Sequence, residues 1–214
     1  METRQDRPAT TPQPGRYEID AGGSTVRFRT RHLFGLAPVR GTFAIASGTI
    51  DVAEPLVGSA VYAEIDAASF CTGNGQRDAT VHSARLLDTG RHPLITFRSE
   101  EIDQSVLLLA LGGTTPLQPP AAEQKALRAP IALGGTTPLQ PPAASQAPRV
   151  SGELTVCGVT RPASLTVELA DVSPRSFTAR AATRVDRTEF GLTAYRGLAA
   201  RFLELSLEVR CVRR

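Results

Sequence analysis

The chain has 214 residues, enough for one large domain or two small ones, and a single all-β barrel falls within this size. Its 24 basic and 21 acidic residues give a net charge of +3 and are spread along the chain, without a block of like charges that would indicate a polyanion-binding tail. Because the sequence also has no Trp to stack on bases, we expect no nucleic-acid partner.

Residues 1–14 are polar and rich in Pro, and they lack the apolar run of a secretory signal. No later stretch has the roughly 18 consecutive apolar residues that a transmembrane helix requires. We therefore expect a disordered tail over residues 1–15, a cytoplasmic location and no insertion into a membrane.

Apolar and polar residues alternate in many segments after residue 16, which is typical of strands with one buried face. Clusters of Gly, Pro and Ser at residues 21–24, 47–48 and 173–174 separate these segments and predict chain reversals. The apolar positions are, in chain order, Val26 and Phe28; Phe43 and Ile45; Val61, Ala63 and Ile65; Ile95 and Phe97; Leu154 and Val156; Leu165, Val167 and Leu169; Phe177, Ala179 and Ala181; and Leu203, Leu205, Leu207, Val209 and Cys211.

Residues 77–88 are the exception, because Val81, Leu86 and Leu87 do not alternate with polar residues. Several good helix formers surround them, and Gly90 follows as a natural stop. We predict one short helix over this segment.

An exact repeat of 13 residues interrupts the strand pattern, at 110–122 and again at 132–144. Both copies are rich in Pro and Gly, and a solenoid needs more copies to bury a core, so we expect a disordered loop over about residues 104–149. A Pro-rich docking segment is the alternative. The rest of the chain is predicted to form one domain, spanning residues 16–214 around this insert.

The cysteines Cys71, Cys157 and Cys211 are an odd number without C-x-x-C spacing, which predicts neither a disulfide framework nor a zinc site. We expect them to remain reduced and to act as small apolar core residues. A metal site formed by the His82, Asp88 and His92 side chains is disfavoured by their irregular spacing.

About eight amphipathic antiparallel strands must cover their apolar faces. Closing the sheet into a barrel does this without leaving an unpaired edge, although an open sandwich would bury the same faces.

Spaced motifs through the predicted domain resemble the opening and later blocks of one family. The opening blocks are Tyr17-Glu18-Ile19-Asp20, Ser24-x-Val26-x-Phe28-x-x-x-His32, Gly41-x-Phe43 and Gly48-x-Ile50. The later blocks are Ile65-Asp66-x-x-Ser69-x-x-Thr72-x-Asn74-x-x-Arg77-Asp78, Ser83-Ala84, Asp88, His92-Pro93-x-Ile95-Thr96-Phe97-x-Ser99, Gly152-x-Leu154-Thr155-Val156-x-Gly158-Val159-Thr160-Arg161-Pro162 and Asp186-Arg187-x-x-Phe190-Gly191. In order and spacing they resemble the YceI-like family of polyisoprenoid-binding barrels. The sequence departs from that family at Thr80, where His is usual, at Leu86 and Leu87, where aromatic residues are usual, at Cys157, where a polar residue is common, and in its long insert.

The resemblance implies an all-β fold, an antiparallel eight-stranded lipocalin-like barrel with one short helix and a disordered Pro/Gly-rich insert. Its channel would bind an apolar isoprenoid or similar lipid, such as a polyprenyl phosphate or a quinone. An eight-stranded barrel has room for one small ligand when inward side chains are small, as Ala63, Ala179, Ala181 and Cys211 are. We expect no cofactor, and the family resemblance makes a homodimer a further expectation.

The predicted apolar wall consists of Val26, Phe28, Phe43, Ile65, Phe97 and Phe190, and the predicted polar ligand contacts are His32, Arg77 and Asp78. Each polar residue also has a structural interpretation: His32 as a hydrogen-bonded turn residue, Asp78 as a helix cap and Arg77 as a brace of the adjoining loop. Arg77 could otherwise clamp a phosphate through its guanidinium fork.

Asp186 and Arg187 are predicted to form an ion pair in a turn at the barrel rim, with contact to a ligand head group as the alternative. Arg161 is predicted to lie at the end of a hairpin.

No nucleophile elbow, H-E-x-x-H helix, P-loop or dinucleotide motif occurs in the sequence, so we expect a binding protein rather than an enzyme, with no catalytic residues. The alternative is a barrel packed solid with side chains, acting as a scaffold or stress-related interaction protein whose repeat loop recruits a partner. The interior volume of the barrel distinguishes the two hypotheses.

Overall fold

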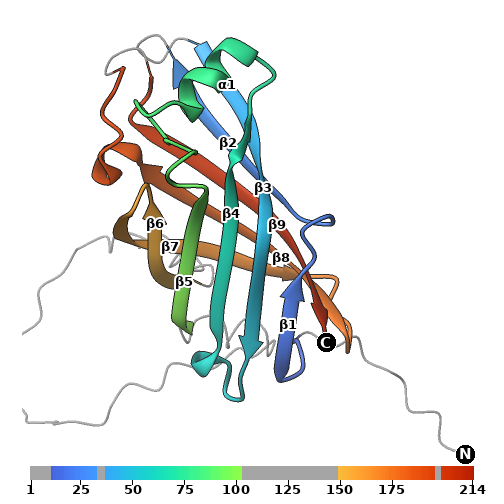
Figure 1. Ribbon diagram of the computed structural model, residues 1–214. Coiled ribbons are helices and arrows are strands. Elements are labelled where there is room, and N and C mark those ends of the chain that lie inside the picture. Colours follow the sequence, from blue (N-terminus) through green and yellow to red (C-terminus); the bar gives the residue numbers. More distant parts are fainter. Residues whose placement is uncertain (1–10, 33–36, 103–148, 196–198) are drawn as a thin grey trace, which may run out of the picture.

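The computed structural model describes residues 11–32, 37–102, 149–195 and 199–214. Within these ranges the chain forms nine strands, one helix and two short 3-10 turns (Figure 1). The elements are β1 (Gly15–Ile19), β2 (Thr25–His32), β3 (Ala37–Val52), η1 (Leu56–Gly58), β4 (Ala60–Cys71), α1 (Gly75–His82), β5 (Leu94–Ile102), β6 (Arg149–Val156), β7 (Val159–Ala170), β8 (Ser176–Asp186), η2 (Arg187–Phe190) and β9 (Phe202–Arg213).

The strands form one antiparallel sheet that closes on itself. Hydrogen-bonded neighbours follow the order β3-β2-β9-β8-β7-β6-β5-β4, and β4 pairs again with β3 to complete the ring. The predicted eight-stranded antiparallel barrel is therefore confirmed, and the open sandwich is not formed. Closure leaves the central strands without a free edge, which removes the template that such an edge offers for pairing with other chains.

The ninth strand, β1, lies end to end with β2, so that both strands occupy the same place in the ring, between β3 and β9. Tyr17 of β1 is opposite Ile50 of β3, and Val26 of β2 is opposite Phe43 further along the same neighbour. Both strands also pair with β9. The break between them is held by two hydrogen bonds to Arg210, whose carbonyl accepts from Asp20 N at 2.9 Å and whose N–H donates to Ser24 Oγ at 3.0 Å.

Two aromatic clusters lie toward opposite ends of the barrel. Near α1, Phe28 stacks on Phe70 with ring centroids 5.0 Å apart, and the Phe43 ring packs against both. Toward the opposite end, Tyr17 meets Phe177 edge-on at 5.0 Å. These side chains are buried, and they narrow the barrel at its ends without filling the middle.

The helix α1 begins two residues before the predicted segment and ends six residues before the end of that segment. Asn74 caps it by accepting a hydrogen bond from Arg77 N at 3.0 Å. The helix ends because Ser83 is extended, with φ −66° and ψ 163°. The chain then turns so that Leu87 N donates to Val81 O at 2.9 Å and the Leu87 side chain is buried.

The three cysteines are free thiols, but only one fits the expected core role well. Cys211 is fully buried, and burial raises the pKa of its thiol to about 12. Cys157 is half-buried with its Sγ 3.2 Å from Leu87 O, and desolvation raises its pKa. Cys71, at the end of β4, is exposed, contrary to the expectation of a core residue.

The predicted disordered tail over residues 1–15 lies outside the described part of the chain except for its last five residues, and so does nearly all of the predicted loop over residues 104–149. No described helix is long and apolar enough to cross a membrane.

A bulge in β5 brings its backbone close to β6. The pairing register shifts between Arg98 and Glu101, and the residue of β6 beside this irregularity is Gly152. A Cβ at Gly152 would contact the Arg98 carbonyl oxygen and would lie 2.8 Å from the Phe97 ring. Glycine is required here because of this close approach, since Cβ atoms essentially never come so near to other heavy atoms.

We expect Gly152→Ala to lower the free energy of unfolding by roughly 1–3 kcal/mol, because the added methyl group must push β5 and β6 apart. Thermal and urea unfolding would measure the change. Gly90→Ala is the matched control, since no heavy atom lies within 4 Å of a Cβ at that position. Equal stabilities of the two variants would contradict this account.

Candidate functional site

The interior of the barrel is a cavity of about 930 Å³. Residues from β1 and from all eight strands of the ring line it, so it extends through the barrel rather than into one side of it. This volume is near the upper end of the usual range for small-molecule pockets, about 300–1,000 Å³. A barrel packed solid with side chains is not compatible with such a cavity.

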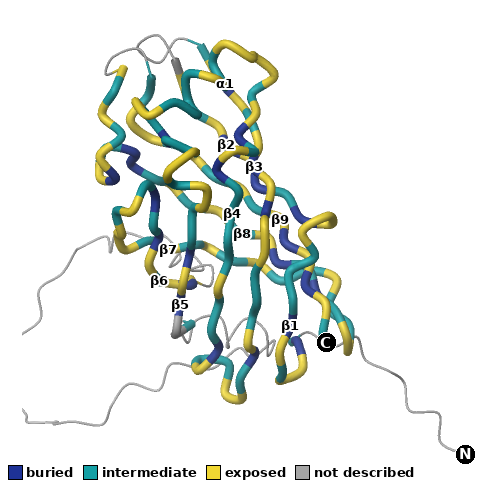
Figure 2. Tube along the Cα trace, in the orientation of Figure 1, coloured by how far each residue is buried: buried dark blue, intermediate teal, exposed yellow. Residues whose placement is uncertain are grey.

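The inward side chains are apolar yet incompletely buried. Along β7, β8 and β9 exposed outward residues alternate with inward residues that are only half-buried, a pattern that Figure 2 shows along the tube. The inward positions of these strands that line the cavity include Leu165, Val167, Leu169, Ala181, Val185, Leu203, Leu205 and Leu207. Side chains facing a packed core would be buried, so these partial exposures are a consequence of the hollow interior.

Small side chains help to keep the interior open. Ala63, Ala179 and Ala181, which the sequence placed inward, line the cavity together with Ala163. Cys211, expected in the same role, lies instead in the buried region at the Tyr17 end of the barrel and is not among the lining residues.

Five of the six predicted wall residues line the cavity: Val26, Phe43, Ile65, Phe97 and Phe190. The sixth, Phe28, is buried in the aromatic cluster with Phe70 beneath α1 and is not among the lining residues. Alternation in β2 gives Phe28 the same face as Val26, but the nearby Phe70 ring occupies the space that Phe28 would otherwise border.

Two of the three predicted polar contacts, Arg77 and Asp78, are not among the residues that line the cavity. Asp78 accepts hydrogen bonds from Thr72 N at 3.1 Å and Thr72 Oγ1 at 2.6 Å, and so ties α1 to the end of β4. Desolvation alone would raise the pKa of Asp78, but these bonds and the nearby His82 and Arg77 hold it below its ordinary value. The helix cap predicted for Asp78 is made by Asn74 instead.

Arg77 lies in the first turn of α1 and contributes its N–H to the Asn74 cap. His32 is the last residue of β2, and its backbone is opposite Ala37 of β3; its side chain lies outside the described atoms. A role of His32, Arg77 and Asp78 in ligand contact stays a prediction.

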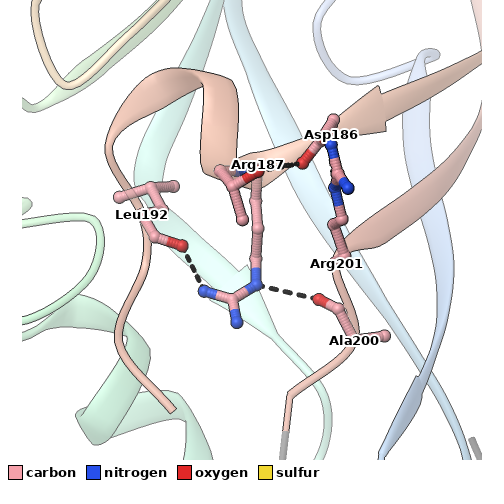
Figure 3. Close-up of polar contacts among 6 residues, drawn as sticks. Asp186, Arg187, Leu192, Ala200 and Arg201 are labelled. Atoms are coloured by element: carbon pink, nitrogen blue, oxygen red, sulfur yellow. Dashed lines mark hydrogen bonds and ion pairs between the residues drawn. The ribbon is translucent and has the colours of Figure 1, made fainter. Parts of the chain in front are cut away.

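Among the described residues that line the cavity, Arg187, in η2 at the end of β8, is the buried charged one. Its guanidinium donates to the carbonyls of Leu192 and, at 2.8 Å, of Ala200 (Figure 3). It also donates to the Ala199 carbonyl at 3.1 Å. These bonds tie Leu192, Ala199 and Ala200 to the end of β8. Burying a guanidinium is costly unless its donors are used, and the carbonyls supply acceptors without a second buried charge.

The prediction that Asp186 forms an ion pair with Arg187 is wrong, because its partner is Arg201. Asp186 pairs with Arg201, whose Nε lies 2.6 Å from Oδ2, while Oδ1 accepts from Thr188 N at 2.9 Å and Thr188 Oγ1 at 2.6 Å (Figure 3). Adjacent residues at a strand end point in different directions, which is why Asp186 and Arg187 do not meet. Arg161 lies after the β6–β7 turn as predicted, and its Nε donates to Glu189 O at 3.1 Å.

The His82, Asp88 and His92 side chains do not form a metal site. No group of three His, Cys, Asp or Glu side chains in the described residues is arranged to bind an ion. The His82 ring instead packs edge-on against Phe70 at 6.0 Å.

Sequence reasoning missed two parts of the cavity. Leu203, Leu205 and Leu207 line it, and their alternation was visible in the sequence without marking them as ligand contacts. Arg187 was treated as a rim residue because its acceptors lie 5 to 13 positions away in an irregular segment. No local pattern would have indicated that burial.

A closed eight-stranded antiparallel barrel around an apolar cavity defines the lipocalin-like class of small-ligand binders. Within that class, the family model of the YceI-like domain matches residues 17–211, and this chain belongs to the YceI-like family. No curated protein matches the sequence.

Solved structures agree with the fold. Burkholderia cenocepacia BcnA has a TM-score of 0.62 and 16% identity, over 90% of this chain and 98% of the other. A polyisoprenoid binding domain from Saccharophagus degradans, implicated in plant cell wall breakdown, has a TM-score of 0.61 and 16% identity, over 92% and 98%.

The Asp186 carboxylate provides a pH-dependent contribution to stability. Desolvation would raise the pKa of Asp186, but hydrogen bonds from Thr188 and the pairing with Arg201 hold it below the ordinary 3.8. A folded-state pKa below the unfolded value means that the stabilisation is complete above 3.8 and is lost as pH falls through the folded-state pKa.

We expect Asp186→Asn to lower the Tm at neutral pH and the difference from the unmodified protein to shrink in acid. Thermal unfolding followed by circular dichroism from about pH 7 to about pH 2 would measure this. Asp51→Asn is the control, because its contact with Arg16 is exposed and 3.9 Å long, and such pairs contribute little. A difference in Tm that is independent of pH would contradict the assignment.

Proposed function

We propose that this protein binds a long apolar isoprenoid-type lipid in the barrel cavity and sequesters or transports it. The observation that carries the proposal is the cavity of about 930 Å³ with its mainly apolar lining. The S. degradans domain of the same fold is described as polyisoprenoid binding, which supports the same class of ligand here. A polyprenyl phosphate, a quinone or a related lipid fits this description.

The energetics favour such a ligand. Each CH₂ group removed from water contributes about 0.8 kcal/mol, so an isoprenoid chain supplies a large driving force before its ordering cost is counted. Binding of this kind requires no catalytic group, and the absence of catalysis stays a prediction. The packed scaffold with a recruiting loop is disfavoured by the cavity itself.

The polar end of the ligand has several candidate contacts. The sequence suggested His32, Arg77 and Asp78, and the buried Arg187 adds a cation within the cavity wall. The cytoplasmic location and the homodimer also remain predictions, which cell fractionation and light scattering would test.

The direct test is native mass spectrometry of the protein purified from a lipid-rich host, followed by organic extraction. The expected result is a stoichiometric apolar adduct that leaves on extraction and identifies the ligand class. A protein that is empty and also takes up neither added polyprenols nor quinones would overturn the proposal.

Phe97→Asp is expected to abolish lipid uptake, because Phe97 lines the cavity and an ionised carboxylate there would have to be desolvated against the ligand chain. Uptake of a fluorescent polyprenol by the purified variant would measure this, with circular dichroism to verify the fold. Unchanged uptake by a folded variant would remove Phe97 from the binding wall.

A variant that fills the cavity tests the site without adding charge. We expect Ala181→Phe to weaken polyprenol binding by about tenfold or more, because displacing two CH₂ groups of the ligand already costs about this much. Ala44→Phe, at an exposed outward position of β3 that does not line the cavity, is the matched control. Equal loss in both variants would point to misfolding rather than occupancy.

A further inference from the structure

The outer surface of β2, β3, β8 and β9 near α1 carries a concentration of arginine. Five exposed arginines and one exposed aromatic ring form what we call the arginine face: Arg27, Arg29, Arg40, Arg184, Arg201 and Phe202. The strand register places Arg29 directly opposite Arg40 on one side and Glu204 on the other, with Arg184 beyond Glu204. These four residues form a row across neighbouring strands, and such neighbours are about 5 Å apart.

Among the described residues, exposed carboxylates are outnumbered on this face. Two of them lie beside it on β9, Glu204 opposite Arg29 and Glu208 two positions from the residue opposite Arg27. The adjoining Asp186 is buried and already bound to Arg201. The outward positions of β4, β6 and β7 carry the carboxylates Glu64, Asp66, Glu153 and Glu168, mixed with the exposed Arg98 of β5 opposite Glu153. The charges of the described residues are therefore mixed on that side and mainly basic on the arginine face.

The facing pair of Arg29 and Arg40 costs stability, because like charges directly opposite on neighbouring strands repel. A surface rich in phosphate would offset that cost by accepting hydrogen bonds from both guanidinium groups. Arginine suits phosphate because its planar fork donates two parallel hydrogen bonds, and the sequence has a single lysine, Lys125.

The surroundings of Phe202 favour an anionic lipid surface over a single-stranded nucleic acid as the polyanion. Its ring is 37% exposed, with the guanidinium carbon of Arg184 at 3.9 Å and that of Arg201 at 5.2 Å from the ring centroid. A ring covered by guanidinium groups is not an open platform for stacking a base. An aromatic ring beside cations does suit the head-group region of a bilayer, where such side chains concentrate.

We propose that the arginine face docks the protein peripherally on an anionic phospholipid surface. The contact is electrostatic and requires no insertion of the chain. This docking does not depend on which ligand the cavity binds. For a lipid carrier, it would place the barrel against a membrane from which the ligand is taken or to which it is delivered.

Co-sedimentation of the full chain with vesicles tests the proposal. The vesicles contain phosphatidylcholine alone or with roughly one third phosphatidylglycerol, at about 0.05 M and about 0.5 M salt. The expected result is binding to the anionic vesicles at low salt, release at high salt and no binding to phosphatidylcholine alone. Failure to bind the anionic vesicles at low salt would overturn the proposal.

The double variant Arg29→Gln/Arg40→Gln is expected to weaken binding to anionic vesicles by about tenfold or more. The control Arg149→Gln/Arg175→Gln removes the same charge from exposed arginines outside the arginine face, at the start of β6 and just before β8, and it should bind within about twofold of the unmodified protein. Equal weakening by both pairs would show a general charge effect and overturn the docking face.

Two further measurements separate the alternatives. A single-stranded oligonucleotide bound more tightly than anionic vesicles at the same salt, and lost in Arg29→Gln/Arg40→Gln, would assign the face to nucleic acid and overturn the membrane proposal. Polyprenol uptake from detergent-free solution should be the same in both variant pairs, so that a failure of cavity binding is distinguishable from a failure of docking.

Discussion

The pairing of β4 with β3 is the constraint on which the other features depend, because it converts a curved sheet into a closed barrel. Closure gives every strand two partners and directs one face of each strand into a shared interior. With eight positions in the ring, that interior is just wide enough for either packed side chains or one small ligand. The alanines facing inward at Ala63, Ala163, Ala179 and Ala181 favour the second outcome.

A hollow barrel loses the dispersion contacts and burial that a packed core would provide. The structure concentrates its packing at the ends, where the Phe28, Phe43 and Phe70 cluster lies beneath α1 and the Tyr17 and Phe177 pair lies toward the opposite end. Packing at the ends therefore stabilises the barrel, while the middle of the barrel keeps the space for a ligand. The half-buried leucines between the ends gain the rest of their burial when a ligand fills the cavity.

Asp186 and Arg187 bind different partners, and both stabilise the end of the barrel where β8 ends and β9 begins. Asp186 holds Arg201 at the start of β9, while Arg187 holds the carbonyls of the segment that leads to that strand. Together they tie the described residues on either side of positions 196–198 to the end of β8. Phe202, the first residue of β9, lies on the outer face beside the guanidinium groups of Arg184 and Arg201. Arg201 binds Asp186, and the next residue, Arg187, lines the cavity, so neighbouring residues contribute to the outer face and to the interior.

The sequence by itself determined which residues face inward, because a period of two is a local property of each strand. Val26, Phe43, Ile65 and Phe97 could be placed on the inner wall for that reason, and the spaced motifs indicated the barrel. Only the tertiary structure decided that Arg201 is the partner of Asp186, that Phe28 stacks on Phe70, and that arginines of β2, β3 and β8 gather with Arg201 on one outer face. Those contacts depend on the register in which distant strands meet, which the order of residues along one strand does not contain.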